Sequence, residues 1–323
     1  MAYRNSLPEN NVYVDGVNGN DAAAVKYNSF HPYKTIGAAL AVASLGDVIY
    51  IRPGTYSTGF VNLFKDGITY NCMPGTFINQ AYFNVIAGQS CTVIGEGIFD
   101  SSGTKILDSL VLGTFYMEAL DIKGIQNTIN YSAGKVTLNV RDIDCYNQGT
   151  INLVDTLSLD PTNNLSINCR DIKSNTFAAG PNPTINNVTG GPGLDATVKV
   201  VARYIYGTPN SDAEIMNFDN YIVPNNRTTI EIIADRVIPL NLTGTNALVT
   251  MFFCDNTKYI INTKMDTRGS SRSCVYILAP MVGTDVSIIG EYLSGGDTAI
   301  KSTGTGGIVR LDGNFTVDAG IEP

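Results

Sequence analysis

The chain has 323 residues, of which 44% are hydrophobic, so it can bury a sizeable core, and disorder throughout is excluded. Charged residues make up only 15%, and 29 acidic against 21 basic residues leave a formal net charge of -8. A nucleic-acid-binding protein needs clustered lysine and arginine to contact phosphates, so this composition argues against nucleic acid as a partner.

The first part of the chain, residues 1–30, is polar and is predicted to be an attachment segment that precedes the repeats. Its start, MAYRNSLPENN, lacks the positively charged and then apolar order of a secretory signal peptide, so export by that route is not expected. The longest apolar run, IGAALAVASLGDVIYI, is interrupted by Gly46 and Asp47, so membrane insertion is not expected either.

Residues 31–59 are predicted to form a capping helix and the first coil, a coil being one circuit of the chain around a stack of strands. The segment TIGAALAVAS (35–44) has its apolar residues at helical spacing, and Thr35 suits the N-cap position. The strand DVIYIRPGTY follows. A helix at this place would cover the apolar end of the stack, where strand edges are otherwise unpaired.

Residues 60–323 contain a repeat of alternating apolar and polar residues, seen in VTLNVRDI, LSINCRDI, VKVVARYI and IEIIADRV. The repeats superimpose when each is aligned on one apolar anchor, and the anchors recur at intervals of roughly 22 to 33 residues, a solenoid period. The anchors are Ile98, Leu120, Ile143, Ile172, Ile205, Val237, Met265 and Leu293. A second short strand follows most of them, so we predict stacked parallel strands with equivalent residues about 4.8 Å apart.

The N-terminal segments VYVDGVNGND and PYKTIGAALAVASLGDVIYIRPGTY resemble the start of right-handed, pectate-lyase-like parallel β-helix proteins. The resemblance implies an all-β fold, a right-handed parallel β-helix solenoid with a short N-terminal capping helix. Such a start occurs in polysaccharide lyases, hydrolases and epimerases, and in the spikes and fibres of bacteriophages and other viruses. It therefore implies a fold more than an activity.

Two aspartates occupy equivalent positions in RDID (141–144) and CRDI (169–172), namely Asp142 and Asp171. Stacking would bring them near the roughly 5 Å separation of a retaining glycosidase, with Asp144 close by, so all three are candidate catalytic residues if the protein is an enzyme. The pair could also hold a cation, although we expect no metal or cofactor. The alternative interpretation is structural, because stacked arginines beside these aspartates could neutralise them.

The remaining chemistry offers few catalytic groups. The only histidine, His31, precedes a proline in a predicted loop and is not expected to act as a base. Four tyrosines are predicted at outward or turn positions and could stack on sugar rings, the alternative being ordinary surface residues; they are Tyr204, Tyr206, Tyr259 and Tyr292. Six cysteines without a C-x-x-C pair are predicted to be reduced core thiols.

An apolar column is predicted on the outer face of the coils. Its members are Val201, Ile233, Ile261, Ile289 and Leu311. Such a stripe would be covered either by a loop of the same chain or by another copy, and we favour a homo-oligomer. A trimer is implied only by the resemblance to β-helix spikes.

These features predict a virion spike or tail protein, assembled in a host cytoplasm, whose homo-oligomeric shaft attaches to other virion proteins and recognises a host surface polysaccharide. The chief alternative is a polysaccharide depolymerase that uses Asp142, Asp144 and Asp171. A surface adhesin is a third interpretation, weakened by the absence of an export signal.

Overall fold

The computed structural model describes most of the chain. The described residues are 10–102, 105–124, 128–145, 150–154, 162–174, 184–188, 196–207, 215–219, 228–240, 247–252, 257–268, 272–277, 283–295, 298–303 and 307–317.

All the strands of the described residues belong to two parallel sheets. The path of the larger sheet, in hydrogen-bonded order, is β1 (Asn11–Val14), β2 (Val48–Ile51), β4 (Ile68–Cys72), β7 (Ser90–Gly95), β10 (Thr114–Gly124), β12 (Lys135–Cys145), β14 (Asn164–Ser174), β16 (Thr197–Tyr206), β18 (Thr229–Ile238), β20 (Lys258–Asp266), β22 (Asp285–Ser294) and β24 (Ile308–Val317). Beside this path lie β3 (Gly54–Ser57), β5 (Thr76–Asn79) and β8 (Ile98–Asp100).

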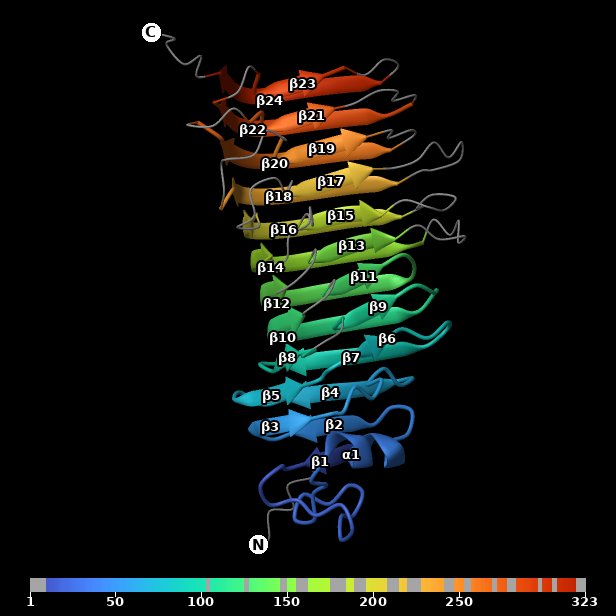
Figure 1. Cartoon of the computed structure of the whole chain (residues 1–323). Helices are drawn as coiled ribbons and strands as arrows, with labels where there is room; N and C mark the ends of the chain where they lie inside the picture. Colours follow the sequence, from blue (N-terminus) through green and yellow to red (C-terminus); the bar gives the residue numbers. More distant parts are fainter. Residues whose placement is uncertain are drawn as a thin grey trace, which may run out of the picture.

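The second sheet is built from shorter strands. In chain order they are β6 (Phe83–Asn84), β9 (Leu107–Ser109), β11 (Ile129–Tyr131), β13 (Ile151–Val154), β15 (Ile185–Val188), β17 (Met216–Asp219), β19 (Val249–Phe252), β21 (Val275–Ile277) and β23 (Ile300–Ser302). The chain alternates between the sheets, so that β12 pairs with β10 and β14 while β11 pairs with β9 and β13. Figure 1 shows the resulting stack, which is the arrangement expected of a β-solenoid.

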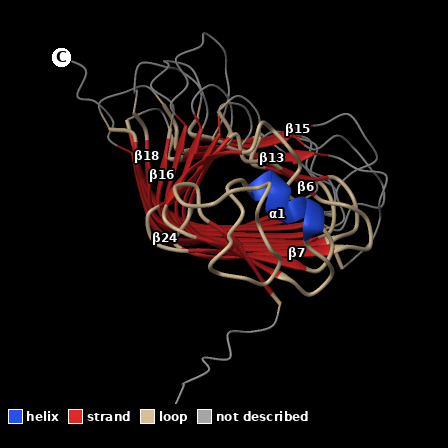
Figure 2. Ribbon diagram, turned by 90° about the horizontal axis from the view of Figure 1, so that it is seen from below, coloured by secondary structure: helices blue, strands red, loops and turns tan. Residues whose placement is uncertain are grey.

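The predicted N-terminal helix is present as α1 (Ile36–Val42). Thr35 is its N-cap, and the Thr35 hydroxyl accepts a hydrogen bond from the Ala38 N–H at 3.2 Å. Ile36 and Leu40 are buried against β1 and β2, so the helix covers apolar side chains at the N-terminal end of the stack (Figures 1 and 2). The prediction of this helix is confirmed.

A buried aspartate fastens the loop next to the cap. Asp15 accepts hydrogen bonds from the N–H groups of Val17 and Asn18 and forms an ion pair with Arg52 at 2.9 Å. Burial opposes ionisation of Asp15, but these hydrogen bonds outweigh it and lower its pKa to about 2. The aspartate of the VYVDG segment therefore has a structural role.

The core lies between the sheets and follows the predicted alternation in the middle coils. Leu138 pairs with Ile167, Ile167 with Val200, and Val200 with Ile232, and all four side chains are buried. The alignment predicted for β12, β14, β16 and β18 is therefore confirmed.

The alignment predicted for β20 is wrong by one residue. Ile232 pairs with Ile261 rather than with Ile260, whereas Val237 still pairs with Met265, so the register shifts between these two pairs. The shift places Ile261 and Tyr259 in the core, each 0% exposed, and turns Ile260 outward. β18 has one residue more than β20 between these two pairs. Because side chains alternate between the two faces of a strand, this extra residue exchanges the inward and outward positions of β20.

The alignments of β10, β22 and β24 also differ from the prediction; in β22, Tyr292 rather than Leu293 pairs with Met265. Ile122, not Leu120, pairs with the anchor Ile143. Leu311 pairs with the core residue Ile288 and so belongs to the inward column, not to the outer face. It is nevertheless 52% exposed, because β24 is the last strand of the described chain and has a partner strand on one side only.

Five of the six cysteines are free thiols in the core, as predicted: Cys72, Cys91, Cys145, Cys169 and Cys274. Burial raises the pKa of Cys72, Cys91 and Cys169 to about 12, which makes these thiols unreactive. The sixth, Cys254, lies outside the described residues. Within the described ranges, no helix is long and apolar enough to cross a membrane.

Candidate functional site

Acidic, basic and aromatic side chains lie together at the C-terminal ends of the neighbouring strands β10, β12, β14 and β16. We call this surface the Asp–Tyr face. Its outward residues on successive strands are Asp121 and Lys123, Asp142 and Asp144, Asp171 and Lys173, and Tyr204 and Tyr206. The register aligns Asp121 with Asp142, Asp142 with Asp171, and Asp171 with Tyr204. The structure thus brings the three predicted catalytic aspartates together with two of the four predicted sugar-binding tyrosines.

Two of the stacked aspartates are bound by arginines from the following coil. Arg141 donates to both carboxylate oxygens of Asp121, at 3.0 and 2.6 Å, and Arg170 donates to both oxygens of Asp142. These are bidentate, charge-assisted hydrogen bonds, which hold a carboxylate in a fixed orientation. Asp142 therefore has its charge balanced within the protein, as the structural interpretation of the sequence requires.

Asp171 is different, because the arginine of the following coil does not bind it. Its Oδ2 lies 3.3 Å from Lys173 Nζ and 3.6 Å from Arg170 Nε. Its Oδ1 is buried and has no hydrogen-bond partner among the described residues, although the residue is only 7% exposed. A buried carboxylate oxygen without a donor is costly, so Asp171 is suited to accept a hydrogen bond from a ligand.

Asp144 also has a buried oxygen, Oδ1, for which the described residues provide no partner. Burial raises the pKa of Asp144, and the nearby Asp142 and Asp121 raise it further, while Lys173 and Lys123 lower it. The surroundings of Asp144 thus make its carboxyl group a weaker acid than a solvent-exposed aspartate.

The two tyrosines form a half-buried aromatic pair. The rings of Tyr204 and Tyr206 meet edge to face, with centroids 6.0 Å apart. Arg203 Cζ lies 4.8 Å from the centre of the Tyr204 ring, and Lys173 Nζ lies 5.5 Å from that of Tyr206. An aromatic surface flanked by cations is therefore present beside the unpartnered oxygen of Asp171.

Three buried threonines hold the backbone of this face in place. The hydroxyl groups of Thr128, Thr150 and Thr184 donate to the carbonyl oxygens of Asp144, Lys173 and Tyr206, respectively, at 2.7 to 2.9 Å. Each threonine begins a Thr-Ile-Asn triplet that leads into β11, β13 or β15. Our sequence interpretation missed these residues, although the repeated triplet was a readable signal.

The other two predicted sugar-binding tyrosines are not on the surface. Tyr259 and Tyr292 are both 0% exposed, and Tyr259 packs on Phe218 while Tyr292 stacks on Phe315. The prediction is wrong for both tyrosines, because the predicted alignments of β20 and β22 are each displaced by one residue. Tyr259 pairs with the core residue Ile230, and Tyr292, not Leu293, pairs with Met265.

The predicted apolar stripe is present only in part. Val201 and Ile233 are neighbours on the outer face and half-buried, but the next residue in their column is Asn262, with Ile289 beyond it. Ile261 lies in the core and Leu311 in the inward column, so neither continues the stripe. The outer apolar residues thus form a short pair and an isolated isoleucine.

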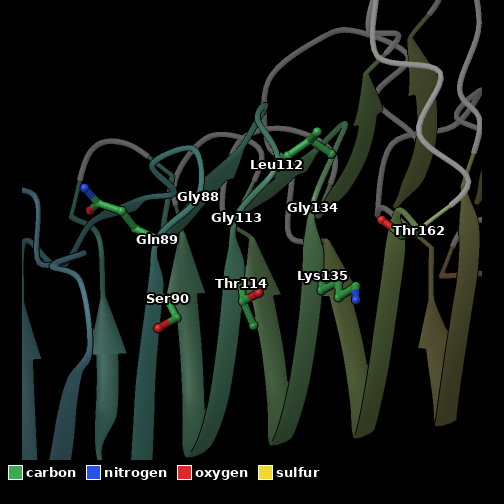
Figure 3. Close-up of a pocket in the computed structure, with 9 residues that line it drawn as sticks. All are labelled: Gly88, Gln89, Ser90, Leu112, Gly113, Thr114, Gly134, Lys135 and Thr162. Atoms are coloured by element: carbon green, nitrogen blue, oxygen red, sulfur yellow. The ribbon is translucent and has the colours of Figure 1, made fainter. Parts of the chain in front are cut away.

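A hollow of about 240 Å³ lies at the opposite end of the long strands (Figure 3). It is lined by Gly88, Gln89, Ser90, Leu112, Gly113, Thr114, Gly134, Lys135 and Thr162. Ser90 pairs with Thr114 and Thr114 with Lys135, so their hydroxyl and ammonium groups follow one another on successive coils. This groove can hydrogen-bond to a polar ligand, but its lining residues include no carboxylate for acid–base chemistry. Sequence reasoning missed it because the groove arises from the stacking of four chain segments that are far apart in the sequence.

Metal binding has no visible basis in the described parts of the chain, where no group of three or more His, Cys, Asp or Glu side chains is close enough to hold an ion. No protein-family model, curated protein or solved structure matches this chain. The case for a function therefore depends on the residues of the Asp–Tyr face.

Proposed function

We propose that the protein is a virion spike or tail protein in which a right-handed parallel β-helix forms a stiff shaft and the Asp–Tyr face recognises a host surface glycan. The main support is the unpartnered oxygen of Asp171 beside the Tyr204–Tyr206 pair, because sugars offer both hydroxyl donors and apolar faces. The stack of hydrogen-bonded coils and the N-terminal resemblance to β-helix spikes support the shaft.

Binding to surface polysaccharides tests this function. We expect the protein to bind at least one capsular or host-surface polysaccharide in biolayer interferometry, and Tyr206→Ala to weaken binding about tenfold, because the ring loses its contact with a sugar face. Tyr276→Ala is the matched control, since Tyr276 lies on the second sheet, also with a lysine over its ring. Absence of binding to every polysaccharide tested would contradict the function.

A homo-oligomeric, trimeric shaft is part of the proposal and is supported by the half-buried Val201–Ile233 pair on the outer face. We expect Ile233→Asp to lower the molar mass measured by light scattering while the circular dichroism spectrum is unchanged, because a charge cannot be buried between copies. Thr137→Asp, on the outer face of β12, is the control and should leave the mass unchanged. A monomeric wild type would rule out the interface.

A polysaccharide depolymerase remains the second candidate function, favoured by the raised pKa of Asp144 and the free oxygen of Asp171. Glycosidases use two neighbouring carboxyl groups, one of which has a raised pKa. The binding experiment separates the two functions if new reducing ends are assayed in the same mixtures. Release of reducing ends that is lost in Asp144→Asn would establish the enzyme instead.

A further inference from the structure

We infer that the glycan recognised at the Asp–Tyr face carries carboxylate groups, and that Arg203 and Lys173 bind the carboxylate while Asp171 accepts a hydrogen bond from a sugar hydroxyl. This inference depends on the proposed glycan-binding function.

The charges of the face become unbalanced at one coil. Arg141 binds Asp121 and Arg170 binds Asp142, each arginine reaching back to the aspartate of the preceding coil. By the same pattern Arg203 would bind Asp171, but its guanidinium lies over the ring of Tyr204 instead. Among the described residues this ring is the only partner that Arg203 has, and its side chain is exposed.

Two cations border the tyrosine pair, and they differ in their partners. Lys173 forms an ion pair with Asp171, whereas Arg203, which is aligned with Asp235 on β18, forms no ion pair among the described residues. On the next strand Arg236 is aligned with Tyr204, and its nearest carboxylate, that of Asp266, is 4.0 Å away. The overall charge of -8 does not prevent Arg203 from binding an anion, because salt screens exposed charges beyond about 8 Å at physiological ionic strength.

Arginine is well suited to select a carboxylate. Its planar guanidinium donates two parallel hydrogen bonds to the two oxygens, as Arg141 and Arg170 already do within this protein. The contact of Arg203 with Tyr204 is weak at an exposed site, so the guanidinium can turn toward a ligand without breaking an ion pair.

Asp171 determines the orientation of the sugar. Its negative charge repels the ligand carboxylate, which must therefore lie on the side of Arg203 and Lys173. Its unpartnered Oδ1 remains for a hydroxyl group, which removes the cost of the buried, unpaired oxygen. A neutral glycan could satisfy Asp171 and the tyrosines, but it would leave Arg203 without a function.

The experiment compares acidic polysaccharides with uncharged derivatives of the same sugars. The probes are polygalacturonate, alginate, hyaluronan and polysialic acid, each beside its carboxyl-reduced form, in biolayer interferometry. We expect at least one acidic polymer to bind about tenfold or more tightly than its reduced form, with weakening as sodium chloride is raised.

Variants locate the effect. Arg203→Gln should lower the affinity for the acidic polymer about tenfold and leave that for the reduced form unchanged, because only the carboxylate contact is lost. Lys135→Gln is the matched control, since it removes one positive charge from the groove of Figure 3 and should change neither affinity. Unchanged circular dichroism spectra would show that both variants fold.

The two proposals fail in different ways. Equal affinity for the acidic and reduced polymers would overturn the inference and leave glycan binding intact. Loss of acidic binding in Lys135→Gln but not in Arg203→Gln would also overturn it, because the ligand would then occupy the groove. Failure of every polymer, acidic or neutral, to bind would contradict the function itself.

Discussion

Gly95→Ala is expected to destabilise the protein by about 3 kcal/mol or more. Gly95 ends β7 with φ +101, a backbone conformation that residues with a Cβ rarely adopt. A Cβ at this position would lie 2.1 Å from the carbonyl oxygen of Cys72, on the neighbouring coil. The clash can be relieved only by separating β4 from β7, which are paired at these two residues.

Guanidinium unfolding followed by circular dichroism measures this change, and amide hydrogen exchange should show that protection is lost first in β4 and β7. Gly37→Ala provides the control, because Gly37 is in α1 and an added Cβ meets nothing within 4 Å. We expect that substitution to stabilise the cap by about 0.5 to 1 kcal/mol. A Gly95→Ala protein that unfolds at the wild-type denaturant concentration would show that the two coils are not in contact as described.

Ile261→Ala is expected to cost about 2 to 5 kcal/mol, whereas Ile260→Ala should cost less than about 1 kcal/mol. Ile261 is fully buried between the sheets, so its truncation leaves a cavity that the neighbouring coils cannot fill. Ile260 is only half-buried on the outer face, where water can replace the lost side chain.

The same unfolding measurement decides between two alignments of β20. If Ile260→Ala proved the more costly of the two, the one-residue shift between β18 and β20 would be wrong, and the continuous outer stripe through Ile261 would be restored. Val200→Ala, in the core of β16, calibrates the cost of a smaller truncation at a position where the predicted and observed alignments agree.

The middle coils were predictable because their long strands are alike in pattern and have the same number of residues between the inward column and the anchor. Between Ile167 and Ile172 in β14, and between Val200 and Ile205 in β16, the same number of residues reaches the bend and the anchor that follows. One alignment therefore satisfies both the inward column and the anchor. The N-terminal helix was equally readable, from its 3.6-residue period and the threonine that caps it.

The coils that begin with β20 and β22 were not predictable in the same way. In KYIIN, both Ile260 and Ile261 are apolar, so alternation alone permits either parity. Counting back from the anchor Met265 favoured Ile260 as the inward residue, which is wrong. The segment from the inward residue to the anchor is one residue shorter in β20 than in β18. Only the pairing of whole strands reveals such a difference.

The candidate site was predicted in composition but not in arrangement. The equivalence of Asp142 and Asp171 followed from the repeated Arg-Asp-Ile motif, and Tyr204 and Tyr206 from their outward parity. The direction of hydrogen bonding did not follow, because each arginine donates to the aspartate of the preceding coil and only approaches its own neighbour. That geometry leaves Asp171 without a hydrogen bond from an arginine of the following coil, and Arg203 without an ion-paired carboxylate.

The amino-acid sequence by itself determined the stacking of parallel strands, the capping helix and the identity of the middle coils, because hydrophobic periodicity and capping are local properties of a chain. The tertiary structure alone decided which of two adjacent isoleucines enters the core, which tyrosines remain at the surface and which charges are left unpaired. These outcomes depend on neighbours that are 20 to 30 residues away in the sequence but one strand, about 4.8 Å, away in space. A single extra residue in one strand exchanges the inward and outward positions of the strand paired with it. The local sequence of that second strand does not show whether its partner contains such a residue.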